Sequence, residues 1–223
     1  MKILISIFVF LLGSLFHSQS AEEIIEKNIE ATGGKTAWKD LKSIILYGNI
    51  TLGLKDTYPV KIYQKRPNLS KTLLIINSRE YVVEGYDGKK GYVRDFSKNL
   101  LRVKEDYVPE NFESELLNWK SKGYIVRFLG REKVLDRECY KIELGRNQYK
   151  TLCFFDIRSF MILKEEKEGE WIFYSDYKKT EGYTFPFRIQ SIPKDKDHKG
   201  GGYILNFSKI EVNPEILSKT FLF

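Results

Sequence analysis

Few residues in this chain have the types and spacing that catalysis requires. After residue 20 the sequence has a single histidine, His198, which lies in a lysine- and glycine-rich stretch without a base-orienting partner. Glu165 and Glu166 are adjacent in a predicted strand and therefore point to opposite faces of a sheet. The sequence contains no nucleophile elbow, phosphate-binding loop or zinc-protease motif. We therefore predict a protein that is not an enzyme, with no catalytic residues, metal site or cofactor.

The two cysteines, Cys139 and Cys153, offer a second kind of chemistry, which is disulfide formation. If Gly145–Asn147 forms a three-residue hairpin loop, the two cysteines lie directly opposite each other, at a separation that a disulfide can bridge. An oxidising compartment outside the cytoplasm would permit the bond. The alternative is a pair of buried free thiols, because a register inferred from sequence can slip by one residue.

The third possible chemistry is the burial of an apolar ligand. Aromatic residues make up 14% of the chain, and most are expected to pack in the core or in cross-strand pairs. A subset lining a pocket would have the same pattern, since both arrangements place apolar side chains on one inner face of a sheet.

The elements that would position such a pocket begin with the stretch Ala21–Gly53. It predicts an amphipathic helix, a stop at Gly33-Gly34, a short turn and then a first long strand. A single helix before an otherwise β-rich chain is expected to cover the apolar side of a curved sheet. We predict that the helix and turn line a cavity against that sheet with four side chains, which are Ile25, Ile29, Trp38 and Leu41.

The rest of the chain predicts roughly eleven strands with turn formers between them, typical of an antiparallel sheet. Val108–Lys122 interrupts this pattern with Pro109 and a partial apolar stripe, which indicates a short helix or an ordered loop as a second covering element. We expect a strongly bent antiparallel sheet with helices across its concave face, an arrangement that leaves room for a ligand.

The first twenty residues have the pattern of a cleavable signal peptide. Lys2 precedes an apolar run over Ile3–Phe16, and small residues at Ser18 and Ser20 fit cleavage after residue 20. An uncleaved membrane anchor is the alternative, but the run is shorter than the ~20 residues that span a bilayer. We expect residues 21–223 to form a single exported domain.

The charge pattern argues against nucleic acid as a partner. Without Lys2 the chain has 36 Lys and Arg against 30 Asp and Glu, and these charges are interspersed rather than gathered into a stripe. Such a pattern is typical of a solvated surface, with at most a mild attraction to anionic lipid head groups.

The N-terminal pattern IIEKNIEATGGKTAWKDLKSIILYGNITLG resembles the start of LolA-like proteins, the bacterial outer-membrane lipoprotein-sorting superfamily. Further short matches follow in order across residues 21–223, including Arg66-Pro67-Asn68, Gly85–Lys89, CYKI at 139–142, Asp176-Tyr177 and Ile210–Asn213. The resemblance implies a mainly β fold, a half-open antiparallel β-barrel whose hydrophobic cavity is covered by N-terminal and central helices.

The resemblance also implies a function. It predicts a periplasmic, monomeric, non-enzymatic carrier or binder of lipid or lipoprotein acyl chains, peripheral to the outer membrane and in contact with envelope membrane proteins. Two alternatives stay open: an envelope protein-interaction or sensor module with the same fold, and, more remotely, a hydrolase with carboxylates from distant strands.

Overall fold

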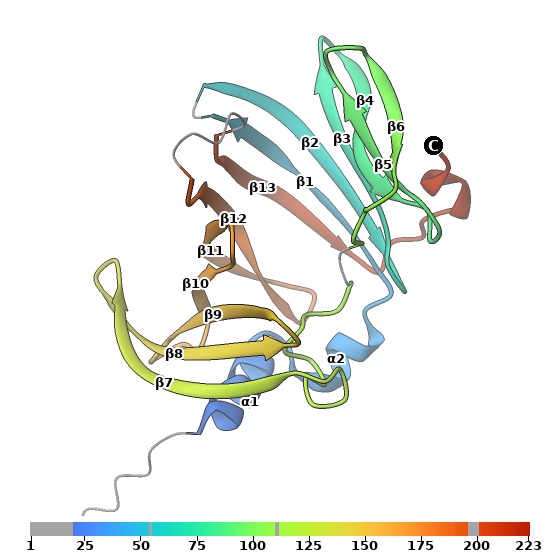
Figure 1. Cartoon of the computed structure of the whole chain (residues 1–223). Helices are drawn as coiled ribbons and strands as arrows, with labels where there is room; N and C mark the ends of the chain where they lie inside the picture. The colour runs from blue at the N-terminus through green and yellow to red at the C-terminus, as the bar shows by residue number, and fades with distance from the viewer. Residues whose placement is uncertain (1–19, 54, 110–111, 196–200) are drawn as a thin grey trace, which may run out of the picture.

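The computed structural model is built on one long, bent antiparallel sheet (Figure 1). It describes residues 20–53, 55–109, 112–195 and 201–223. The predicted signal peptide and His198 lie outside these residues. Within the described ranges, thirteen strands run in the order β6-β5-β4-β3-β2-β1-β13-β12-β11-β10-β9-β8-β7. Within the described chain β6 and β7 each have one neighbour, so the sheet is open, and the predicted mainly β, half-open architecture is confirmed.

The strands follow the chain as hairpins, except that β1 and β13 pair at the centre of the sheet. Their bounds are β1 (Ser43–Leu52), β2 (Asp56–Lys65), β3 (Leu69–Ile76), β4 (Arg79–Tyr86), β5 (Gly91–Asp95), β6 (Leu100–Lys104), β7 (Ile125–Val134), β8 (Arg137–Arg146), β9 (Tyr149–Asp156), β10 (Ile162–Glu166), β11 (Glu170–Thr180), β12 (Tyr183–Pro193) and β13 (Tyr203–Val212).

Two N-terminal helices pack against one half of this sheet. α1 (Ala21–Ala31) begins after Ser20, whose side-chain oxygen accepts a hydrogen bond from the Glu23 backbone N–H at 3.1 Å. α2 (Gly34–Asp40) follows after Gly33, whose φ of 136° lies in the region that favours glycine. Figure 1 shows α1 beside β7–β9, and a short C-terminal 3₁₀ helix, η1 (Ser218–Phe221), beside β3–β5.

The apolar face of α1 forms the main core with the inner face of β8 and β9. Ile24, Ile25 and Ile29 are buried against that face, and Leu116 and Leu117 complete the cluster. Full burial of one such side chain contributes about 1.5–3 kcal/mol. The helix therefore covers the apolar side of the sheet, as predicted, and burial of its apolar face holds the helix in place.

The central helix predicted within Val108–Lys122 is not seen in the described part of this range, residues 108–109 and 112–122. Residues 112–123 contain bends and turns, and the alternative of an ordered loop applies. Asn118 has a φ of 56°, which an α-helix does not accommodate. The segment nevertheless buries Leu116 and Leu117 against α1, so it covers the sheet as expected. We call residues 112–123 the cover segment.

The predicted disulfide is wrong in register. The β8–β9 hairpin turns at Asn147-Gln148 rather than at Gly145–Asn147, so Cys139 lies opposite Asp156, and Cys153 opposite Ile142. An offset of three residues puts the two thiols on opposite faces of the sheet. Both are buried free thiols in separate core clusters.

Candidate ligand pocket

A cavity of about 250 Å³ lies between the helices and the middle of the sheet. α1, α2 and the cover segment form one wall, and β11 and β12, with residues of the β10 strand, form the other. The lining side chains are Asn28, Ile29, Thr32, Trp38, Ser114, Leu117, Ile162, Glu165, Tyr174, Tyr177, Thr184, Phe185 and Pro186.

One part of the lining is apolar and tightly packed. Ile29 and Leu117 are buried, and Trp38 packs edge-to-face on Phe185 with ring centroids 5.8 Å apart. Tyr183, which stacks on Phe185, also packs edge-to-face on the indole at 5.5 Å, and its hydroxyl donates to the Ala37 backbone oxygen at 2.6 Å. Edge-to-face aromatic pairs stabilise such an arrangement beyond their buried area, so the indole is fixed at the cavity wall.

Another part of the lining carries a buried carboxylate. The Tyr174 hydroxyl donates to Oε2 of Glu165 at 3.0 Å, and the Lys167 ammonium lies 3.6 Å from the same oxygen. The Glu165 side chain is 17% exposed. Burial raises the pKa of its carboxyl above the ordinary value, while Lys167 and Tyr174 oppose that shift. Burial beside this carboxylate also raises the pKa of the Tyr174 hydroxyl.

A chain of hydrogen bonds fixes the polar groups on the helix side. The Trp38 indole N–H donates to Oγ1 of Thr32 at 3.1 Å, and that hydroxyl donates to the Asn28 backbone oxygen at 2.9 Å. The Asn28 amide donates to the Phe160 backbone oxygen at 2.7 Å. These donors are therefore engaged within the protein.

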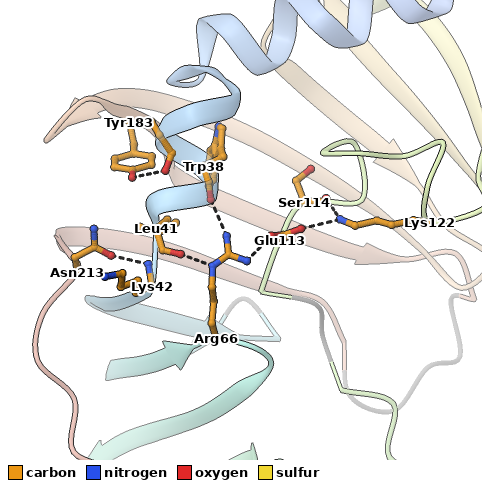
Figure 2. A network of polar contacts seen from close by, with 10 residues as sticks. Trp38, Leu41, Lys42, Arg66, Glu113, Ser114, Lys122, Tyr183 and Asn213 are labelled. Carbon is orange, nitrogen blue, oxygen red and sulfur yellow. Dashed lines mark hydrogen bonds and ion pairs between the residues drawn. The ribbon is translucent and has the colours of Figure 1, made fainter.

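The cover segment is tied to α2 by Arg66, which lies in the turn after β2 (Figure 2). The Arg66 guanidinium donates to the backbone oxygens of Leu41 at 2.5 Å and Trp38 at 2.7 Å, and it is paired with the Glu113 carboxylate. Lys122 lies 3.4 Å from the same carboxylate. Arg66 thus connects the end of α2 to the cover segment, which contributes Ser114 and Leu117 to the cavity lining.

The electrostatics of Glu113 favour its pairing with Arg66 and Lys122. Burial alone would raise the pKa of its carboxyl, but the hydrogen bond and positive charge of Arg66, with Lys122, lower the pKa below the ordinary value. Lys122 also donates to the Ser114 backbone oxygen at 2.9 Å, within the cover segment itself.

The structure separates the four predicted cavity residues into two pairs. Ile29 and Trp38 line the cavity, whereas Ile25 and Leu41 are buried in the adjoining core clusters. Sequence reasoning missed the polar set, which comprises Arg66, Glu113, Glu165, Tyr174 and Tyr177.

A backbone irregularity hid part of that set. Glu165 and Glu166 do point to opposite faces: Glu165 lines the cavity, and Glu166 pairs with Lys164 outside it. Tyr174 and Tyr177 are three residues apart and would ordinarily face opposite sides of a strand. The φ of 53° at Asp176 interrupts the alternation, so both tyrosines line the cavity.

Two further properties concern the described residues alone. Among them, no group of three or more His, Cys, Asp or Glu side chains is placed to hold a metal ion. None of the helices in this part of the chain has the length and apolar character needed to cross a membrane.

Comparison with known proteins places this architecture in the LolA-like fold. No protein-family model matches the sequence, and no curated protein matches it. A solved LolA superfamily protein from Nitrosomonas europaea aligns with a TM-score of 0.58 and 18% identity, covering 92% of this chain and 98% of that one. A putative outer membrane lipoprotein-sorting protein domain from Vibrio parahaemolyticus aligns with a TM-score of 0.58 and 14% identity, over 90% and 95%.

A third solved structure extends the comparison. A DUF1329 family protein from Desulfovibrio piger aligns with a TM-score of 0.58 and 14% identity, covering 91% of this chain and 97% of that one. Alignment over nearly the full length of all three chains shows that the fold is LolA-like, as the sequence resemblance predicted.

Proposed function

We propose that this protein binds acyl chains of lipids or lipoproteins in the cavity between its helices and sheet, as a carrier that leaves them chemically unchanged. The observation that supports this proposal is the apolar wall of Ile29, Trp38, Leu117 and Phe185 in a cavity that a separate segment covers in part. Each methylene group moved from water into such a site contributes about 0.8 kcal/mol. The lipoprotein-sorting role named for the Vibrio neighbour with the same fold agrees with it.

The size of the cavity bears on how a chain would enter. Its volume of about 250 Å³ is below the roughly 300–1,000 Å³ of most small-molecule sites. In this arrangement the cavity therefore accommodates one end of an acyl chain. A longer chain requires the cover segment to move, and the Arg66–Glu113 pair is the contact that such a movement breaks.

The proposed setting is the cell envelope. Residues 1–20 act as the export signal, and residues 21–223 act as one monomeric domain in the periplasm, peripheral to the outer membrane. The partners would be lipids or acylated proteins and the envelope membrane proteins that exchange them.

The test begins with protein purified from its native envelope without detergent. We expect mass spectrometry of an organic extract to find a stoichiometric lipid or acylated peptide. Ile29→Trp should reduce its amount strongly, because the larger side chain occupies the cavity. Ile125→Trp makes the same substitution on β7 at a side chain that is 63% exposed and serves as the matched control.

A clean extract, together with no binding of added decanol by the folded protein, would contradict the carrier proposal. It would favour the envelope interaction module, which uses the same fold with a filled interior.

A further inference from the structure

We propose that the Glu165 end of the cavity recognises the ligand's head group, so that the site selects alkyl or acyl chains ending in an ammonium group over chains ending in a carboxylate. This inference rests on the proposed function, because it names the class of ligand that the same cavity takes. Three features of the lining support it: its hydrogen-bond donors are mostly used within the protein, the described contacts of the Glu165 carboxylate involve one of its two oxygens, and the charges around that carboxylate favour a cation.

Most lining side chains that have a single polar hydrogen already donate it to another group of the protein. Each of four side chains has one polar hydrogen, and each donates it to another group of the protein: Thr32, Trp38, Tyr174 and Tyr177. The hydroxyls of Ser114 and Thr184 also line the cavity, and a hydroxyl accepts as well as donates. The lining is therefore suited to a ligand that brings hydrogens of its own.

The carboxylate of Glu165 has one oxygen to offer. In the described part of the chain, its contacts with Tyr174 and Lys167 are both made through Oε2. In the proposed complex Oε1 accepts from the ligand, and hydrogen bonds between an ammonium group and a carboxylate are stronger than those between neutral groups. A ligand carboxylate at this position would instead place two like charges side by side in a buried site.

The local charge balance supports a cation. Burial raises the pKa of the Glu165 carboxyl, and Glu115 acts in the same direction, so a positive partner is still favourable there. Lys167 is the basic group that faces this carboxylate, but its side chain is 45% exposed and its ion pair is long at 3.6 Å. Solvent screens such a pair, and it neutralises Glu165 only in part.

The test compares three probes that share one alkyl chain at pH 7: decylammonium and decanoate below their micelle concentrations, and decanol below its solubility limit. Isothermal titration should give at least about tenfold tighter binding of decylammonium than of decanoate. The net charge of +7 on the whole chain would by itself favour the anion, so this preference reports the cavity. In Glu165→Gln the preference should disappear while decanol affinity is retained. Glu166→Gln, which changes the neighbouring carboxylate on the other face, should leave the preference unchanged.

The outcomes separate this inference from the proposed function. If decanol binds but decylammonium binds no more tightly than decanoate, the inference is wrong and the carrier proposal stands. The same holds if a folded Glu165→Gln variant still prefers decylammonium to decanoate. If none of the three probes binds the folded protein, the carrier proposal itself fails. Circular dichroism of each variant establishes that it is folded.

Discussion

At the scale of single residues, Glu165 has a cost to stability as well as a role in the pocket. Burial, and to a lesser extent Glu115, raise the pKa of this carboxyl in the folded chain, so the folded chain holds its proton more tightly than the unfolded chain does. The contribution of Glu165 to stability is therefore fully present below the ordinary carboxyl pKa. That contribution is lost as pH rises through the raised value. We expect Glu165→Gln to increase the free energy of unfolding at pH 7, with little change near pH 4. Urea denaturation at both pH values measures this difference, and a less stable variant at pH 7 would contradict it.

The two cysteines give a prediction about reactivity. Burial raises the pKa of the Cys139 thiol to about 11 and that of Cys153 well above its ordinary value. Because the thiolate is the reactive form, neither should react with an aromatic disulfide reagent at pH 8 in the native protein. Both should react after unfolding in urea without reductant. A gain of two hydrogens in mass on reduction would instead establish a disulfide.

The same residues show why the site could be predicted only in part. Ile29 and Trp38 could be predicted from the sequence because helical spacing and a glycine stop identify which side chains face the sheet. Glu165 was not, because its place in the cavity depends on pairing among β9, β10 and β11, which no local pattern specifies. Arg66 and Glu113 are 47 residues apart and meet only in the folded chain.

At the scale of elements, the cover segment depends on Glu113. Burial of this carboxyl is outweighed by Arg66 and Lys122, so its pKa is lowered and its stabilising effect is present above the ordinary pKa. The effect is lost as pH falls through the lowered value. We expect Glu113→Gln to weaken closure by about 1 kcal/mol at neutral pH. Faster hydrogen exchange over residues 112–123 measures this weakening.

A matched control for this prediction lies on α1. Glu23 forms an exposed i,i+4 pair with Lys27 at 2.7 Å, and such pairs contribute little. Glu23→Gln should therefore leave exchange in the cover segment unchanged. Equal exchange in the Glu113→Gln variant and the native protein would show that Arg66 does not hold the segment closed.

The elements also show where sequence patterns fail. Glycine is typical of turns, but Gly130 lies inside β7, where the register shifts by one residue and its φ is 110°. The chain turns instead at Leu135-Asp136, and Leu135 adopts a φ of 53°. A bulge and a turn both favour glycine, so composition alone does not distinguish them. Strand existence was predictable along most of the chain because alternation is local, whereas registers depend on partners.

At the scale of the whole molecule, the two halves of the sheet have different roles. The cavity is lined by α1, α2, the cover segment and β10–β12, and the β1–β6 half contributes none of the described lining. That half is completed by the C-terminal segment, whose Phe221 is buried against Ile45 and Ile216. Lys71 fixes the segment by donating to the backbone oxygens of Thr220 at 2.6 Å and Leu222 at 2.7 Å.

This division predicts that stability and ligand binding can be changed separately. Phe221 is 2% exposed, and truncation of such a buried ring to alanine costs about 3–5 kcal/mol. The adjacent Leu222 is 70% exposed, so Leu222→Ala should leave stability unchanged and serves as the control. Because the ring of Phe221 lies outside the cavity lining, Phe221→Ala should keep the decanol affinity of the native protein under conditions where it remains folded. Loss of decanol binding by folded Phe221→Ala protein would show instead that the two halves are coupled, with the outer half setting the shape of the cavity.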